Sequence, residues 1–179
     1  MNHKIFIIIL IITACIVSCN NSGKDKGLTE QQKLAKEIAK TEEDLFDDVQ
    51  PNRDKAIAMI DIYLDYVAKY PKDTICPEYL FKASEIAMNF DQPHNSIRYL
   101  TQIETGYPDY SKYATSIFMK AYVYDYFIGD TEKAREYYTR YIEHYPDHTF
   151  VKDAEGALMF LGMNDDQLIE LFQDINKYN

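Results

Sequence analysis

Residues 56–72 read AIAMIDIYLDYVAKYPK, and this stretch decides the fold class. Apolar side chains recur along it at helical spacing, but they fill two stripes where an isolated amphipathic helix has one. The first stripe is Ile57, Ile60, Leu64 and Val67, the second is Met59, Tyr63, Tyr66 and Tyr70, and the polar stripe is Asp61, Asp65 and Lys69. A helix with two apolar faces needs neighbours on both sides, so this stretch predicts a helix inside a stack of helices.

The stretch ends in a Tyr-Pro pair that returns twice further along the chain. The three tripeptides are Tyr70-Pro71-Lys72, Tyr107-Pro108-Asp109 and Tyr145-Pro146-Asp147, and their prolines are 37 and then 38 residues apart. Proline donates no N–H and disfavours helical conformation in the residue before it, so each tyrosine is expected to end a helix. Asp73, Asp109 and Asp147 follow closely and are predicted to cap the next helices. A fixed period of this length indicates stacked helix pairs.

Other short signals mark the remaining helix ends. They are the capping box Thr29-Glu30-Gln31-Gln32, Pro51, the pair Gly129-Asp130, Gly162, and Asn164 with Gln167. Glycine ends a helix by taking the left-handed conformation, and an aspartate, asparagine or threonine opens the next. On the helix from about Thr131 to Tyr145, Glu136 and Arg140 have the spacing of an ion pair. We therefore predict an all-α domain over residues 28–179, a helix-turn-helix solenoid of about four helix pairs with the last pair as a cap.

The N-terminus carries a separate signal. An apolar run from Ile5 to Val17 follows Lys4, and its length of about 13 residues falls short of the roughly 20 that span a bilayer, which favours a secretory signal. Ile16-Val17-Ser18-Cys19 resembles the lipobox of bacterial lipoproteins, in which the signal is cut before the cysteine and that cysteine carries the lipid. The resemblance implies a signal peptide over residues 1–18, lipidation of Cys19 and a flexible tether over residues 19–27.

Two other interpretations of this segment stay open. Ile12-Thr13-Ala14-Cys15 fits the same pattern, although a cut there would leave Ile16 and Val17 exposed at the new terminus. An uncleaved anchor, or an ordinary secretory signal with incidental cysteines, would leave Cys19 without lipid. If Cys19 is lipidated and Cys15 removed, Cys76 is the remaining cysteine and no intrachain disulfide can form. Cys76 is expected to be a small buried residue.

The repeats resemble tetratricopeptide repeats in the version with Tyr-Pro endings. In one unit the positions that match the signature are Leu80, Ala83, Ser84, Ala87, Ser96, Leu100, Ile103 and Pro108. The tryptophan of the signature is missing, and Ser84 replaces its first-helix glycine. A lipobox followed by such repeats is also similar to the tetratricopeptide lipoproteins of the outer-membrane β-barrel assembly machinery, although this chain has fewer helix pairs.

The resemblance implies a concave groove lined by the first helix of each pair. At helical spacing the groove wall would comprise Phe81, Glu85 and Met88 in one unit and Met119, Val123 and Tyr126 in the next. Aromatic and methionine side chains give large contact areas at low entropy cost, which suits the binding of a peptide or helix. The alternative for each of these residues is a place in the core.

Composition and motifs weigh against several other functions. The chain has 29 acidic and 19 basic residues, and it lacks the clustered cations that bind a nucleic-acid backbone. The acidic run from Glu42 to Asp48 lacks the spacing of a calcium loop and reads as a solvated helix face. Pro146 separates His144 from His148, which makes a metal site there improbable. No motif for a catalytic triad, a phosphate loop or a zinc protease occurs, so neither a small-molecule cofactor nor a metal is expected.

Three functions remain open at this point. The leading one is a non-catalytic scaffold, anchored by lipid to the outer membrane and facing the periplasm, that binds protein partners of the cell envelope and takes part in outer-membrane protein assembly. The second is a periplasmic adaptor of cell-wall synthesis or division, similar to the tetratricopeptide partners of the Tol system. The third is a glycan-acting enzyme, which would need two convergent carboxylates in a cleft.

Overall fold

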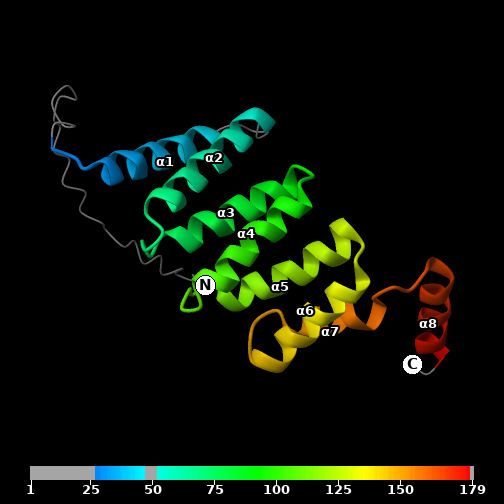
Figure 1. Ribbon diagram of the computed structural model, residues 1–179. Coiled ribbons are helices and arrows are strands. Elements are labelled where there is room, and N and C mark those ends of the chain that lie inside the picture. The colour runs from blue at the N-terminus through cyan, green and yellow to red at the C-terminus, as the bar shows by residue number, and fades with distance from the viewer. Residues whose placement is uncertain (1–26, 47–51, 178–179) are drawn as a thin grey trace, which may run out of the picture.

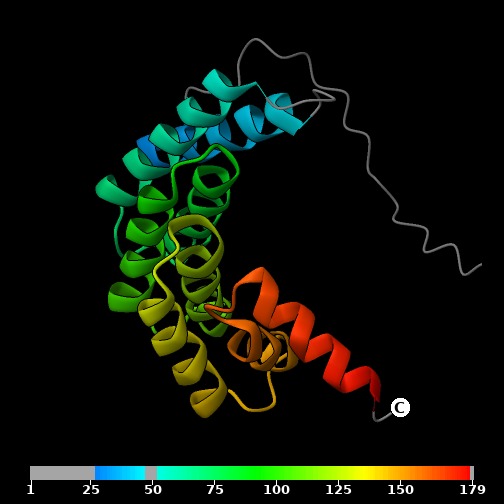
Figure 2. The same cartoon turned by 90° about the vertical axis from the view of Figure 1, so that its right-hand side faces the viewer.

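The computed structural model describes residues 27–46 and 52–177, and the elements in these ranges are all helices. In chain order they are α1 (Glu30–Phe46), α2 (Arg53–Lys69), α3 (Cys76–Asn89), α4 (Pro93–Gly106), α5 (Tyr113–Val123), the π-helix η1 (Tyr124–Ile128), α6 (Thr131–His144), α7 (Val151–Phe160) and α8 (Asp165–Lys177). Successive helices pack pairwise (Figure 1) into an array that curves (Figure 2). The prediction of an all-α array of helix pairs is confirmed. The predicted signal peptide, Cys19, Cys15 and Pro51 lie outside the described residues.

Helix α2 is buried on both of its apolar stripes, as a helix inside a stack should be. Met59 and Tyr63 of one stripe are 0% and 1% exposed, and Ile60 of the other stripe is 3% exposed. Tyr63 of α2 stacks on Tyr79 of α3, with ring centroids 5.1 Å apart and the rings nearly parallel. Burial on two sides therefore joins α2 to both α1 and α3.

The three Tyr-Pro corners end α2, α4 and α6 as expected, with Tyr70, Tyr107 and Tyr145 in the position after each helix. The aspartate caps were predicted wrongly. The N-cap residues of the helices that follow are Ile75, Lys112 and Phe150, and none of them makes a side-chain cap. Of the three aspartates, Asp73 alone accepts a nearby N–H among the described residues, that of Ile75 at 3.1 Å.

The reason for the missing caps is the backbone of each corner. In all three corners the carbonyl of the tyrosine accepts the N–H three residues later, and that residue's carbonyl accepts the N–H three residues later again, at 2.9 to 3.2 Å. Two consecutive turns of this kind satisfy the backbone groups that a capping side chain would otherwise serve. The corners also contact one another, because the Tyr107 hydroxyl donates to the carbonyl of Pro71 at 3.0 Å.

The other predicted helix ends that fall within the described residues are confirmed. Thr29 and Gln32 form a reciprocal capping box, with the N–H of Thr29 donating to Gln32 Oε1 at 2.9 Å and the N–H of Gln32 donating to Thr29 Oγ1 at 3.2 Å. Asn164 and Gln167 repeat it at the start of α8, with both bonds at 3.0 Å. Asp130 accepts the N–H of Lys133 at 3.0 Å and so caps α6.

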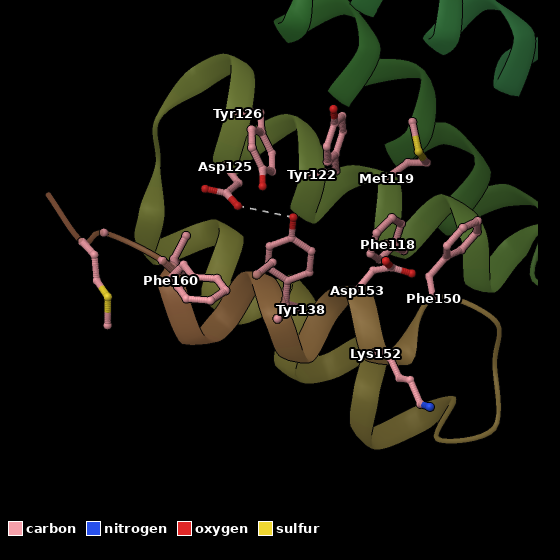
Figure 3. A pocket seen from close by; sticks show the side chains of 15 residues that line it. Phe118, Met119, Tyr122, Asp125, Tyr126, Tyr138, Phe150, Lys152, Asp153 and Phe160 are labelled. Atoms are coloured by element: carbon pink, nitrogen blue, oxygen red, sulfur yellow. Dashed lines mark hydrogen bonds between the residues drawn. The ribbon is translucent and has the colours of Figure 1, made fainter. Parts of the chain in front are cut away.

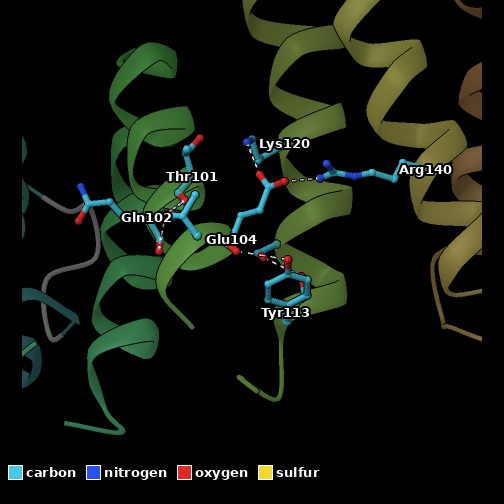
Figure 4. A network of polar contacts seen from close by, with 8 residues as sticks. Thr101, Gln102, Glu104, Tyr113, Lys120 and Arg140 are labelled. Atoms are coloured by element: carbon cyan, nitrogen blue, oxygen red, sulfur yellow. Dashed lines mark hydrogen bonds and ion pairs between the residues drawn. The ribbon is translucent and has the colours of Figure 1, made fainter. Parts of the chain in front are cut away.

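Half-buried carboxylates join neighbouring helices. Glu104 of α4 accepts from Lys120 of α5 at 2.6 Å and from Arg140 of α6 at 2.7 Å, as Figure 4 shows. Arg140 therefore pairs with Glu104, and its predicted pairing with Glu136 is wrong. Burial alone would raise the pKa of the Glu104 carboxyl, but the hydrogen bonds and charges of Lys120 and Arg140 outweigh it and leave the pKa lowered.

Two core clusters lie along the array. The first extends from Ile38 of α1 to Ile103 of α4, and the second from Ile117 of α5 to Leu161 after α7, with Tyr113 packed against both. Among the described residues, neither cluster includes one from α8, which stands apart from the other helices in Figure 1 rather than covering the end of the array. No helix within the described ranges combines the length and the apolar character that crossing a membrane requires.

Candidate functional site

A cavity of about 780 Å³ opens between η1 and α7, at the end of the array nearest α8. Its walls come from α5, η1, α6 and the segment from Phe150 to Met163 (Figure 3). The side chains that line it include Phe118, Met119, Tyr122, Asp125, Tyr126, Tyr138, Phe150, Lys152, Asp153, Phe160 and Met163. Large apolar groups also remain exposed at its edge, since Tyr126 is 67% exposed and Phe160 and Met163 are each 36% exposed. Such a concentration of exposed apolar surface is typical of an interaction site.

The aromatic walls are held by contacts between rings. Phe118 stacks on Phe150 with ring centroids 4.9 Å apart and lies 5.8 Å from Tyr138. Tyr122 and Tyr126 are neighbours at 4.8 Å. These contacts join α5, η1, α6 and the start of α7, so the cavity is formed by packed elements rather than by one loop.

The π-helix shapes one wall of the cavity. It ends at Gly129, whose φ of 75° gives the left-handed conformation that glycine adopts without strain. Within it Tyr124 is 9% exposed while Tyr126 and Phe127 are 67% and 40% exposed. Short π-helical segments occur often at functional sites, because they redirect side chains that a regular helix would bury or misplace.

Asp125 brings a carboxylate into these aromatic surroundings. The Tyr138 hydroxyl donates to Asp125 Oδ2 at 3.4 Å, which is a long hydrogen bond. Desolvation raises the pKa of the Asp125 carboxyl above its ordinary value, and the hydrogen bond from Tyr138 opposes that shift only in part. Desolvation also raises the pKa of the Tyr138 hydroxyl. The tyrosine therefore stays protonated and able to donate at neutral pH.

The structure brings together two of the six residues predicted for the groove. Met119 and Tyr126 both line the cavity. Val123 is 0% exposed and belongs to the core. It lies on the same helical stripe as Ser116 and Lys120, and Lys120 contacts Glu104 of α4, so this stripe faces the preceding helix pair. Tyr122, one position earlier, takes the place on the cavity wall.

The three predicted residues of α3 lie outside this cavity. Phe81 is 6% exposed and packs against Tyr110, with the amino group of Lys112 5.1 Å from its ring centroid. Met88 is half-buried and Glu85 is exposed. Desolvation by neighbouring atoms raises the pKa of the Glu85 carboxyl, partly offset by the charge of Lys112. Phe81 is therefore part of the core, and Glu85 is the one member of the three that presents mainly to solvent.

Sequence reasoning missed several residues of the cavity. Asp125 lies in a π-helix, which no periodic pattern predicts. Phe160 and Met163 lie on either side of Gly162, the glycine after α7. The apolar pair Met159-Phe160 directly before Gly162 was the available signal, because two large apolar residues at a helix end need either a core or a partner. In the described ranges no group of three or more His, Cys, Asp or Glu side chains could hold a metal ion.

Cys76 is free and fully buried at 0% exposure. Desolvation raises the pKa of its thiol, which disfavours the reactive thiolate form. The thiol donates to the carbonyl of Tyr70 at 3.1 Å and so belongs to the first Tyr-Pro corner. Its expected role as a small buried residue is confirmed.

The segment that forms much of the cavity wall matches a known protein family. Residues 115–148 match the tetratricopeptide repeat. The matched repeat contains most of α5, then η1, α6 and the third Tyr-Pro corner. No curated protein and no solved structure matches the chain. Tetratricopeptide repeats suggest protein partners, and here the repeat carries Met119, Tyr122, Asp125, Tyr126 and Tyr138 on the cavity wall.

Proposed function

We propose that this protein is an envelope scaffold that binds a segment of a partner protein in the cavity between η1 and α7. The observation that carries the proposal is the coincidence of the cavity with the tetratricopeptide repeat at residues 115–148. Tyr126, Phe160 and Met163 offer exposed apolar surface at its edge, and burial of such surface is the main driving force of association.

Binding without catalysis is part of the proposal. A glycan hydrolase needs two convergent carboxylates whose environments set their pKa values apart. Asp125 and Asp153 both line the cavity, but most of the other lining side chains are aromatic or apolar, which supports the binding of a partner segment.

The location of the scaffold is proposed from the N-terminal sequence. The lipobox-like Ile16-Val17-Ser18-Cys19 supports a lipid on Cys19, which would tether the array to the outer membrane on its periplasmic side. The likeness of this arrangement to tetratricopeptide lipoproteins of the outer-membrane assembly machinery supports a role in the assembly of outer-membrane proteins. The tether of residues 19–27 would let the cavity reach partners near the membrane.

Site-specific photo-cross-linking in intact cells tests the binding site. We expect a photoreactive amino acid at Tyr126 to capture one or a few defined envelope proteins. The same amino acid at Glu136, an exposed residue of α6 outside the cavity, serves as the control and should not capture them. Identical products from both positions, or none from Tyr126, would contradict the proposal.

Labelling with a palmitate analogue tests the anchor separately. The wild-type chain should incorporate the label and fractionate with outer membranes, and Cys19→Ser should do neither. Cys15→Ser provides the matched control and should leave labelling unchanged. Label that persists in Cys19→Ser but disappears in Cys15→Ser would move the lipid to the other cysteine.

A further inference from the structure

We propose that the cavity recognises a lysine or arginine side chain of the partner segment, bound by the Asp125 carboxylate between aromatic walls, with apolar residues of that segment on Phe160 and Met163. This inference rests on the proposed function and specifies the chemistry of the partner. It is carried by a comparison of Asp125 with the other half-buried carboxylates of the same chain.

Three of those carboxylates hold a cation, and the other two, Asp73 and Asp130, accept backbone N–H groups at 3.1 and 3.0 Å. Glu42 pairs with Lys82 at 2.7 Å, Glu78 with Lys112 at 2.9 Å and Glu104 with Lys120 at 2.6 Å. Asp125 is half-buried as well, but in the part of the chain that the structure describes its hydrogen-bond partner is a hydroxyl 3.4 Å away and it makes no ion pair. Burying a carboxylate with neither a cation nor a backbone N–H donor costs free energy, so a site that retains one is suited to a cation from elsewhere.

The pKa directions agree with this geometry. Burial would raise the pKa of the Glu78 carboxyl, but Tyr110 and Lys112 outweigh it and leave the pKa lowered, as Lys120 and Arg140 do for Glu104. For Asp125, desolvation outweighs the single hydrogen bond from Tyr138, and the pKa of its carboxyl is raised. A bound ammonium or guanidinium would supply the missing stabilisation of the ionised form.

Two lysines of this chain bind between a carboxylate and an aromatic ring. The amino group of Lys120 lies 4.4 Å from the centroid of the Tyr137 ring while it pairs with Glu104. The amino group of Lys112 lies 5.1 Å from the Phe81 ring while it pairs with Glu78. The Asp125 end of the cavity offers the same combination of carboxylate and rings without an internal cation. Because the faces of aromatic rings attract cations, we expect a cation of the partner to bind there.

The remaining charges of the cavity are compatible with a basic guest. Asp153 adds a second carboxylate to the lining. Lys152 also lines the cavity, but Figure 3 shows its amino group pointing away from Asp125 and Tyr138. The formal charge of the whole chain is −10, which attracts a basic segment over long range and repels an acidic one.

Peptide selection followed by a double-mutant cycle tests the inference. A phage library of random heptapeptides is selected against the full-length protein in detergent, and the same library against Asp125→Asn. The best peptide is then synthesised with both ends blocked, together with a version in which glutamine replaces its basic residue. Fluorescence anisotropy measures the binding of both peptides to wild type, to Asp125→Asn and to Asp147→Asn, an equal charge change at an exposed corner.

We expect the peptides selected by wild type to contain Lys or Arg next to apolar residues. Replacement by glutamine should weaken binding to wild type about tenfold, the Asp125→Asn change should weaken the basic peptide by a similar factor, and the two effects should not add. Asp147→Asn should bind as wild type does.

Four outcomes would overturn the inference. They are selection of peptides without a basic residue, an equal loss from glutamine in wild type and Asp125→Asn, selection of no peptide, and a dimer in sedimentation equilibrium that removal of α8 abolishes. The first two would leave the cavity as a peptide-binding site, so the proposed function could stand without this inference. Photo-cross-linking at Tyr126 decides the proposed function independently.

Discussion

Glu104 holds two cations from different helices, and one of them is almost inaccessible to water. Lys120 is 2% exposed, and its amino group contacts Glu104 at 2.6 Å and lies 4.4 Å from the ring centroid of Tyr137. A buried ammonium is tolerated only with a partner, because its desolvation costs several kcal/mol. Glu104 therefore determines whether α4, α5 and α6 can pack as they do.

We expect Glu104→Gln to lower the free energy of unfolding by about 3 kcal/mol, because it leaves the Lys120 charge buried without a counter-charge. Lys120→Met in the same chain should recover most of the loss, since it removes the buried charge as well. Urea unfolding followed by circular dichroism measures both variants. Glu136→Gln, on the exposed side of α6, is the control and should change stability by no more than about 0.5 kcal/mol.

The Asp125 carboxylate has the opposite effect on the free energy of unfolding. Its pKa is raised by desolvation, so the ionised carboxylate destabilises the folded state at any pH above that raised pKa. Asp125→Asn should therefore raise the free energy of unfolding at pH 7, by about 0.5 to 1 kcal/mol, because it removes a desolvated charge.

The pH dependence of this gain provides its control. As pH falls through the raised pKa, the wild-type carboxyl becomes protonated and its cost disappears, so the difference between the two proteins should vanish below about pH 4, near the ordinary carboxylate value. Denaturant midpoints measured from pH 7 down to pH 4 give the comparison. A variant less stable than wild type at pH 7 would show that Asp125 serves the fold rather than a ligand.

The residues of the site show the limits of periodic patterns. Met119 and Tyr126 could be predicted to share a wall because seven residues span two helical turns. The choice between Tyr122 and Val123 could not be made, since it depends on Lys120 pairing with Glu104 of α4 and turning that stripe of α5 inward. An ion pair between residues 16 apart in the chain leaves no local signal in either helix.

Helix ends followed from sequence wherever the determining interaction is local. The proline after each corner tyrosine acts on the residue directly before it, and the two capping boxes join residues three apart. The aspartate caps failed because the Tyr-Pro corner has its own backbone hydrogen bonds. The π-helix could not be predicted, because its wider turn, closed by the N–H of Gly129 on the carbonyl of Tyr124, has no periodic signal in the sequence.

Gly129 offers a test of that helix end. Its φ is 75° and a Cβ atom built on it meets nothing within 4 Å, so the cost of a side chain there is conformational alone. Gly129→Ala should lower the free energy of unfolding by about 1 kcal/mol. Gly106→Ala is the matched control, because it also meets nothing within 4 Å but ends α4 without a positive φ. It should stabilise by about 0.5 kcal/mol. Equal effects in thermal unfolding would argue against the left-handed end of η1.

The contact between corners is a second test. The Tyr107 hydroxyl donates to the Pro71 carbonyl at 3.0 Å and connects two successive Tyr-Pro corners. Tyr107→Phe should cost about 0.5 to 1 kcal/mol in urea unfolding, the usual net worth of one hydrogen bond. Tyr145→Phe is the matched control, because the Tyr145 hydroxyl makes no hydrogen bond within the described residues, and it should be nearly neutral. A neutral Tyr107→Phe would mean that the corners stack by shape alone.

Contacts between neighbouring helices stabilise the whole array. The two core clusters meet at Tyr113, which packs against both and donates from its hydroxyl to the carbonyl of Glu104 at 3.3 Å. In such a solenoid the stability of each unit depends on the units beside it, so a helix outside the core clusters should open most easily. α8 is that helix, because none of its described residues belongs to either core cluster.

Hydrogen exchange should therefore follow position in the array. We expect amide protons of α2 to α6 to exchange slowly, through opening of the packed clusters, and those of α8 to exchange within seconds at neutral pH. Removal of residues 164–179 should change the free energy of unfolding by less than about 1 kcal/mol, since no described side chain of α8 belongs to either core cluster. Slow exchange in α8, measured by mass spectrometry on the full chain, would show instead that this helix packs against something in solution. A dimer in sedimentation equilibrium would then identify a second copy as its neighbour, and a monomer would point to closure of α8 over its own cavity.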